Sequence, residues 1–147
     1  MPYVKAFMKE VFRIHPSPLG NVRVLAKPIL LSGYHIPAGV LIILSAVATE
    51  SIQEKSYGPD FATFAPKRWL RSSTRSIHPF ASLPFGFGPR MCIGKRFAEM
   101  EMAVFLIRLL QNYEVVDSKL KEDQVEWYFN VVHTPTKPYN LNLKNRV

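Results

Sequence analysis

The chain has 147 residues, about the length of one ordinary domain, and 48% of them are hydrophobic, 20% charged and 12% aromatic. This composition supplies enough apolar side chains for a core and excludes a disordered tail. Nineteen Lys and Arg against eleven Asp and Glu give a net charge of +8, and a single cysteine excludes an internal disulfide. The apolar run from Ala38 to Ala48 is too short to span a bilayer.

The positive charge is compatible with nucleic acid, an acidic protein or an anionic membrane surface. No zinc-finger spacing or RNA-binding aromatic signature accompanies it, so we expect no nucleic-acid partner. The first sixteen residues contain Lys and Glu throughout, which is unlike a secretory signal or a mitochondrial transit peptide. Any targeting signal is therefore expected outside this sequence.

The first predicted element is an amphipathic helix over residues 3–14, which His15 and Pro16 end because proline restricts its predecessor. Lys5, Lys9 and Arg13 are spaced at i, i+4 and i+8 and line one side of it. Its apolar side is formed by Val4, Phe7, Met8, Val11 and Phe12.

A small antiparallel sheet is predicted next. Residues 21–25 read as one strand, and the β-rich runs 30–36 and 40–47 are joined by the turn residues Pro37, Ala38 and Gly39. Residues 49–60 suggest a short helix that ends at a Gly58-Pro59 turn. Residues 61–76 read as a loop with aromatic anchors.

Residues 78–94 have no regular periodicity and hold three prolines and three glycines, and a long helix follows at once. Asn112 is its expected end, and two β-like runs, 125–132 and 139–143, form the tail. Apolar residues recur at spacings of four and three in this helix, so we expect one buried face. That face comprises Ile93, Phe97, Met100, Val104 and Ile107.

Cys92 is the most informative residue, because it lies between Gly88 and Gly94 directly before the long helix. A helix start presents free amide donors, which together with Arg90 and Lys95 suit a thiolate. Glycines let the backbone approach a large flat group, so the arrangement fits a thiolate directed at a metal centre. The alternatives are a small buried hydrophobic residue, a catalytic thiol that lacks a recognisable base, and a zinc site that lacks further ligands.

Three short segments form recognisable motifs: residues 10–13, EVFR, residues 64–69, FAPKRW, and residues 85–94, FGFGPRMCIG. Together they resemble the cytochrome P450 family. The last segment fills all five fixed positions of that family's haem-binding loop, F-x-x-G-x-R-x-C-x-G, and the first two look like the E-x-x-R of its K helix and its F-x-P-x-R-W segment. The motifs occur in family order, and the resemblance covers essentially the whole chain.

The resemblance implies haem b as cofactor, with Cys92 as the axial thiolate ligand of the iron. Arg90, Arg23 and His78 resemble haem-propionate partners, since a guanidinium suits a carboxylate. The alternative reading is that they are surface arginines and a turn histidine. The remaining residues assigned to the haem loop are Phe85, which is otherwise plain core, and Gly86, Gly88 and Gly94.

By the same resemblance, Glu10, Arg13 and Arg68 form a structural network that supports the haem loop. Glu10 and Arg13 are one helical turn apart, so their side chains can meet. The alternative is an ordinary solvated pair worth a few tenths of a kcal/mol.

The helix over residues 3–14 resembles that of mitochondrial, arthropod-like members, in which two lysines four residues apart bind an adrenodoxin-like ferredoxin. Lys5 and Lys9 match them, and Lys95 and Arg96 extend the basic surface. A merely solvated basic face is the alternative. The expected location is the matrix side of the inner mitochondrial membrane, with the endoplasmic reticulum membrane as the alternative.

The resemblance implies a mixed α+β fold that is mainly α in the complete family domain. We expect residues 1–147 to be the carboxy-terminal part of one such domain, from a K-type helix through a small sheet, cysteine loop and L-type helix to a β-hairpin. Most of the substrate pocket would then lie outside it, as would any membrane contact. We expect these residues alone to be inactive.

The implied activity is a monooxygenase that inserts one atom of O2 into a lipophilic small molecule with ferredoxin-derived electrons. A truncated, non-catalytic haem-binding remnant is the alternative, and a basic interaction module without haem is a third.

Overall fold

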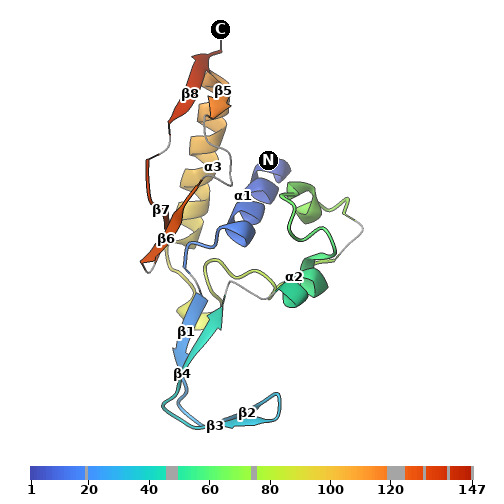
Figure 1. Cartoon of the computed structure of the whole chain (residues 1–147), viewed down its shortest axis with the longest axis vertical. Coiled ribbons are helices and arrows are strands. Elements are labelled where there is room, and N and C mark those ends of the chain that lie inside the picture. The colour runs from blue at the N-terminus through green and yellow to red at the C-terminus, as the bar shows by residue number, and fades with distance from the viewer. Residues whose placement is uncertain are drawn as a thin grey trace.

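The structure is a computed structural model that describes residues 1–18, 20–45, 50–73, 76–118, 125–130, 132–138 and 140–146 (Figure 1). Helices, two short 3-10 helices (η) and strands are mixed along the chain, which confirms the mixed α+β class. In chain order they are α1 (Pro2–Ile14), β1 (Gly20–Val24), β2 (Ile29–Leu31), β3 (Tyr34–Ile36), β4 (Leu41–Ser45), α2 (Glu50–Tyr57), η1 (Pro66–Trp69), η2 (Gly88–Arg90), α3 (Lys95–Asn112), β5 (Tyr113–Ser118), β6 (Trp127–Asn130), β7 (Val132–Pro135) and β8 (Leu141–Asn145).

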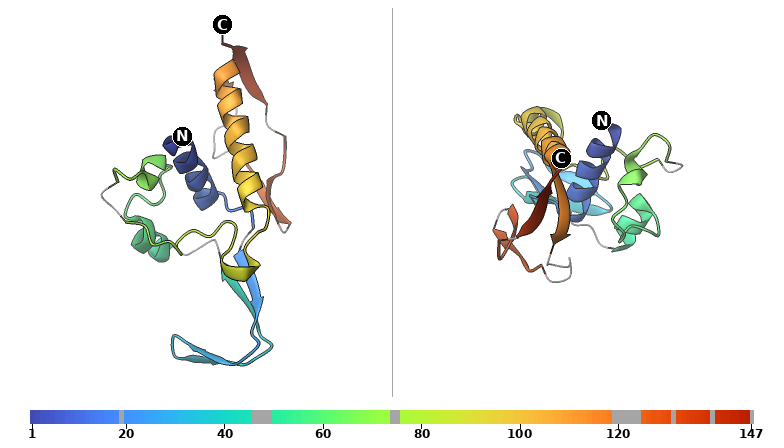
Figure 2. Two further views of the ribbon diagram at one scale, coloured as in Figure 1. Left: turned by 180° about the vertical axis from the view of Figure 1, so that it is seen from behind. Right: turned by 90° about the horizontal axis from the view of Figure 1, so that it is seen from above.

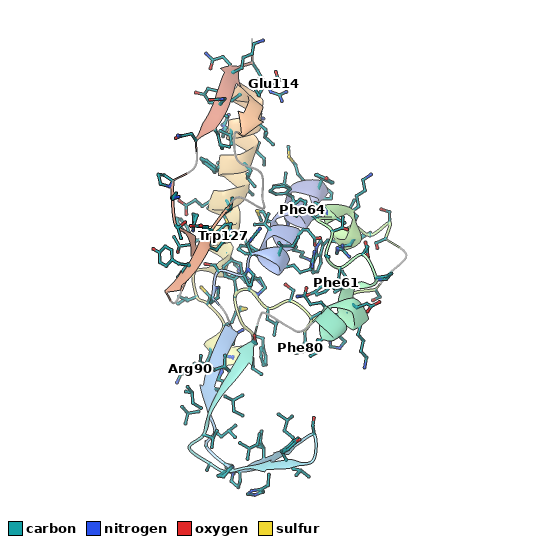
Figure 3. The ribbon with its side chains drawn as sticks, in the orientation of Figure 1. Phe61, Phe64, Phe80, Arg90, Glu114 and Trp127 are labelled. Atoms are coloured by element: carbon teal, nitrogen blue, oxygen red, sulfur yellow. The ribbon has the colours of Figure 1, made fainter. Side chains whose placement is uncertain are left out.

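Helix α1 forms where the sequence predicts it and lies between α3 on one side and α2 with η1 on the other (Figures 1 and 2). Pro2 occupies the first turn, where its missing N–H costs nothing, and His15 and Pro16 follow the last turn. Phe64 meets the ring of Phe7 edge-on at 5.5 Å, and Trp127 stacks on His15 at 4.7 Å (Figure 3). Helix α1 therefore packs against η1 and α3 and contacts β6 through His15.

The small antiparallel sheet predicted after α1 does not form as expected, because its strands pair differently. Residues 30–36 are not one strand, because Ser32 and Gly33 have φ angles of 48° and 84° and form a tight turn between β2 and β3. Strand β4 pairs with β1 instead, with Asn21 opposite Leu44 and Arg23 opposite Ile42. The described strands form two-stranded antiparallel pairs rather than one sheet, and residues 46–47 of the predicted third strand lie outside the described residues.

Helix α3 ends at Asn112 as predicted, but it begins at Lys95, so Ile93 precedes it and is fully exposed. The prediction that the apolar face of α3 is buried is wrong within this chain. The side chains of Phe97, Met100 and Val104 are all more than half exposed, although α1 and β5 contact α3. Among the described residues, no helix is long and apolar enough to cross a membrane.

The hairpin expected between residues 125–132 and 139–143 is wrong, because β6 pairs with the adjacent β7 and the run predicted at 139–143 pairs elsewhere. It forms β8, which pairs antiparallel with β5, a strand that follows α3 without a loop and was not predicted. Residue 139 lies outside the described residues. Figure 2 shows β8 running along the carboxy-terminal half of α3.

Candidate functional site

The segment from Phe85 to Cys92 is a closed loop directly before α3. The amide of Cys92 donates a hydrogen bond to the Phe85 carbonyl at 2.9 Å, and the Met91 amide donates to the Gly88 carbonyl at 3.0 Å. Gly86 and Gly88 have φ angles of 72° and 69°, a region that glycine adopts without steric cost. The backbone path of the loop therefore favours glycine at positions 86 and 88.

The Cys92 side chain is exposed, so the buried-hydrophobe alternative is wrong for this chain. Gly94 caps the start of α3, and a Cβ built on it would lie 3.9 Å from the Cys92 sulfur. The absence of a side chain at Gly94 leaves room beside the sulfur. An accessible thiol in a closed, glycine-lined loop fits a thiolate ligand to a large planar group such as haem.

Two contacts tie this loop to the rest of the fold. The half-buried Phe85 ring meets the Phe12 ring of α1 edge-on at 5.4 Å. The side-chain amide of Asn21 on β1 donates through Nδ2 to the Leu83 backbone carbonyl at 3.3 Å. The loop is therefore positioned by α1 and β1 together, and Phe85 is a packing residue at the base of the loop.

The three candidate propionate partners lie in different elements. Arg90 is exposed at the end of η2, where the cysteine loop approaches β1 (Figure 3). Arg23 on β1 donates to the adjacent Val22 carbonyl at 2.7 Å. His78 is exposed, and its Nδ1 accepts a hydrogen bond from the Phe80 amide at 3.2 Å. Their assignment to haem stays a prediction.

Glu10, Arg13 and Arg68 form one buried network, so the solvated-pair alternative is wrong. Arg13 donates to both carboxylate oxygens of Glu10 at 2.9 and 3.0 Å, and Arg68 Nε donates to Glu10 Oε1 at 3.0 Å. Glu10 is 0% exposed, and the Ala65 amide and Trp69 Nε1 also donate to it, at 2.8 and 2.7 Å. The roles of Ala65 and Trp69 were not predicted, although both belong to the F-x-P-x-R-W segment.

Arg68 connects this network to the following segment. Its guanidinium donates to the backbone carbonyls of Tyr57, Asp60 and Thr63 at 2.9 to 3.1 Å and pairs with the Asp60 carboxylate at 3.3 Å. The two buried arginines thus share one fully buried carboxylate and several carbonyl acceptors. This distribution leaves α1, α2 and η1 held together by charge-assisted hydrogen bonds.

The pKa of Glu10 is held down by its partners. Burial alone raises it, but the hydrogen bonds from Arg13, Ala65 and Trp69 and the charge of Arg13 outweigh burial and lower it from 4.5 to about 2. The ionised carboxylate therefore stabilises the folded state above about pH 4.5.

We expect this stabilisation to be lost as the pH falls from about 4.5 toward 2, because the folded-state pKa lies below the unfolded one. The free energy of unfolding should decrease by about 3 kcal/mol when Glu10 is fully protonated. Urea denaturation of the wild type and of Glu10→Gln at a series of pH values measures it. The difference in the free energy of unfolding between the wild type and Glu10→Gln should become smaller as the pH falls. A difference that does not depend on pH would contradict the assignment of an ionised Glu10 carboxylate.

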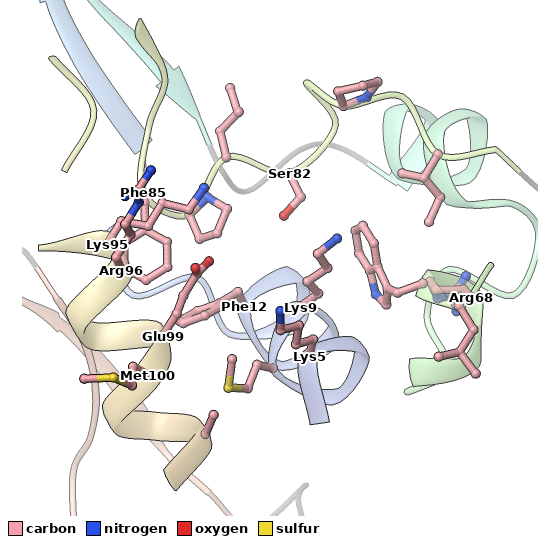
Figure 4. A pocket seen from close by; sticks show the side chains of 18 of the residues that line it. Lys5, Lys9, Phe12, Arg68, Ser82, Phe85, Lys95, Arg96, Glu99 and Met100 are labelled. Atoms are coloured by element: carbon pink, nitrogen blue, oxygen red, sulfur yellow. The ribbon is translucent and has the colours of Figure 1, made fainter. Parts of the chain in front are cut away.

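A groove of about 880 Å³ lies between α1, α3 and the segment around residues 77–85. Lys5 and Lys9 from α1 and Lys95 and Arg96 from α3 surround it, with Glu99 among them (Figure 4). The Lys9 ammonium lies 5.4 Å from the centroid of the Trp69 ring, a cation–π contact that orients it. The fold therefore brings together the four basic residues that the sequence singled out.

Comparisons with known proteins agree with the motifs. The family model described as cytochrome P450 matches residues 1–143. The chain is 43% identical over 147 residues to the Drosophila melanogaster protein named "Probable cytochrome P450 301a1, mitochondrial", covering 97% of this chain and 26% of that protein. It is 38% identical to the protein of Oncorhynchus mykiss named "Cholesterol side-chain cleavage enzyme, mitochondrial", covering 98% of this chain and 27% of that one.

A solved structure of cyanobacterial CYP120A1 with bound retinoic acid superposes with a TM-score of 0.81 at 30% identity, covering 99% of this chain and 33% of that one. The chain spans about a quarter of the length of the curated relatives named here. Haem held by a cysteine thiolate is the family's cofactor, and Cys92 is the only cysteine in this sequence. Motifs, fold and relatives agree, and the chain belongs to the cytochrome P450 family.

Proposed function

We propose that this chain carries the haem-thiolate centre of a monooxygenase. The enzyme inserts one atom of O2 into a lipophilic small molecule and reduces the other to water. The observation that supports the proposal most strongly is the exposed Cys92 sulfur in a closed loop at the start of α3. Thiolate-ligated haem supplies the oxygen activation, and the protein supplies binding and orientation.

Within this proposal, the Cys92 thiolate would bind the haem iron, and Gly86, Gly88 and Gly94 would let the loop approach the porphyrin. Phe85 braces the loop against α1. The guanidinium groups of Arg90 and Arg23 and the imidazole of His78 are the propionate partners, and a guanidinium is suited to a charge-assisted hydrogen bond with a carboxylate.

The electron donor in this proposal is an adrenodoxin-like ferredoxin. Lys5, Lys9, Lys95 and Arg96 surround one groove, and a basic surface accelerates encounter with an acidic partner. Relatives from Drosophila melanogaster and Oncorhynchus mykiss carry "mitochondrial" in their names, which supports the mitochondrion over the endoplasmic reticulum. The matrix side of the inner membrane is the location that this proposal adds.

The test is the spectrum of the reduced, carbon-monoxide-bound full-length protein. We expect the strongly red-shifted Soret band of thiolate-ligated haem, followed by turnover with a reduced ferredoxin. A protein that purifies colourless after haem supplementation contradicts the proposal. The thiolate spectrum without turnover on any lipophilic substrate identifies the non-catalytic haem-binding remnant instead.

Reversal of both Lys5 and Lys9 to Glu should raise the Kd for an adrenodoxin-type ferredoxin on the order of tenfold at low salt. Two attractive charges become repulsive, and salt should reduce the difference because it screens exposed charges. Titration with the ferredoxin, followed by the haem spectrum, measures it. The matched control reverses the exposed Lys27 and Lys55, which do not line the groove. Equal Kd values for both double variants would refute the docking surface.

A further inference from the structure

The side chain of Asn21 on β1 contacts the turn that leads into the cysteine loop. Its Nδ2 donates to the Leu83 carbonyl at 3.3 Å, and the same carbonyl accepts a hydrogen bond from the Gly86 amide at 3.0 Å. Asn21 therefore binds the one acceptor that closes the turn from Leu83 to Gly86. The preceding sequence motifs give no role to Asn21.

Gly86 also packs so closely against Asn21 that a side chain at position 86 would clash with it. Gly86 is buried with a φ angle of 72°, and a Cβ built on it would lie 2.6 Å from Asn21 Oδ1. Contacts that short are not found in folded proteins, so a side chain at position 86 requires a shift of the Asn21 side-chain amide, the same group that donates to Leu83. We call this arrangement, the Asn21–Leu83 hydrogen bond together with the absence of a side chain at Gly86, the interlock.

The interlock lies between two groups assigned to haem. Residue 86 directly follows Phe85, whose carbonyl accepts the Cys92 amide at 2.9 Å. Asn21 and Arg23 are two residues apart on β1, so their side chains lie on the same face of the strand. Pairing with β4, in which Leu44 is opposite Asn21, keeps that strand in register.

We propose that Asn21 is a positioning residue that fixes the cysteine loop relative to β1, and so fixes the Cys92 sulfur relative to Arg23. This inference rests on the proposed function, in which Cys92 and Arg23 hold the same haem. Asn21 does not touch the cofactor in this scheme. It acts through the Leu83 carbonyl on the loop that presents the thiolate.

The first experiment introduces Asn21→Ala into the haem-loaded full-length protein. We expect haem transfer to a haem-scavenging protein to accelerate roughly two- to tenfold, the usual range for one such hydrogen bond. The fraction of the reduced carbon-monoxide complex with the red-shifted Soret band should fall with time. In the haem-free protein, alkylation of Cys92, followed by mass spectrometry, should also become faster because the loop is less restrained.

The matched control is Asn112→Ala. Asn112 Nδ2 donates to the Arg108 carbonyl at 2.7 Å at the far end of α3, so this variant loses the same kind of bond away from the loop. Its haem transfer, Soret position and Cys92 alkylation should equal those of the wild type. If Asn21→Ala and Asn112→Ala give the same three values, Asn21 has no positioning role.

The second experiment combines Gly86→Ala with Asn21→Ala. Gly86→Ala alone should accelerate haem transfer by more than Asn21→Ala, because it both strains the backbone and displaces the amide. In the Asn21→Ala background its effect should be several-fold smaller, since the Oδ1 atom is gone. If Gly86→Ala accelerates haem transfer by the same factor with and without Asn21→Ala, the interlock does not exist.

The two proposals fail in different ways. A wild-type protein without the red-shifted Soret band contradicts the proposed function, and Cys92 alkylation in the haem-free variants then still decides whether the interlock exists. A wild type with that band and an Asn21→Ala variant indistinguishable from it contradicts the inference about Asn21 alone.

Discussion

Replacing Glu10 with alanine is expected to cost the folded protein on the order of 3–5 kcal/mol and to abolish haem incorporation. The change leaves the buried Arg13 and Arg68 side chains without their shared carboxylate. It also removes the acceptor for the Ala65 amide and the Trp69 indole. The η1 segment then loses its hydrogen bonds to the Glu10 carboxylate on α1. Denaturant unfolding and the haem-to-protein ratio of the full-length variant measure the two effects.

The control for this prediction is Glu54→Ala, which removes an exposed carboxylate from α2. An exposed charge of this kind should change stability by less than about 0.5 kcal/mol and leave haem content unchanged. Wild-type haem content in Glu10→Ala would show that the network is dispensable for the haem loop.

Replacing Cys92 with serine is expected to abolish the red-shifted Soret band of the reduced carbon-monoxide complex and, with it, all turnover. A serine hydroxyl has a far higher pKa than a thiol and is a poorer iron ligand, so the axial bond is lost. The fold of the haem-free protein should be unaffected, because the Cys92 side chain is exposed. Circular dichroism and denaturant unfolding check the fold, and the carbon-monoxide difference spectrum checks the ligand.

Met91→Leu is the matched control for that change. Met91 is the adjacent residue, is also exposed, and its replacement removes the other sulfur of the loop. Its spectrum should equal that of the wild type. Retention of the thiolate band by Cys92→Ser would mean that Cys92 is not the ligand and would end the functional proposal.

Local sequence was sufficient for the features that depend on near neighbours along the chain. The haem-loop motif over residues 85–94 identified the family, and Gly86 and Gly88 within it have positive φ angles that favour glycine. The extent of α1 followed from helical periodicity and from Pro16, and the end of α3 at Asn112 was also foreseen. Spacing alone allowed Glu10 and Arg13 to meet.

The tertiary structure decided what depends on segments far apart in the chain. Alternating or β-rich residues do not specify a partner strand, so the pairing of β4 with β1 and of β8 with β5 could not be predicted. Periodicity showed that α3 has an apolar face but not whether any element of this chain covers it, and Phe97 and Met100 are exposed.

The same distinction applies to the site. The sequence identified Cys92, Glu10, Arg13 and Arg68 because motifs record them, and it located the lysines by their spacing. Only the folded chain shows that Trp69 donates to Glu10 and that Asn21 meets Leu83, contacts between residues 59 and 62 positions apart. Such contacts depend on how whole elements pack, because no local backbone rule connects residues at that separation.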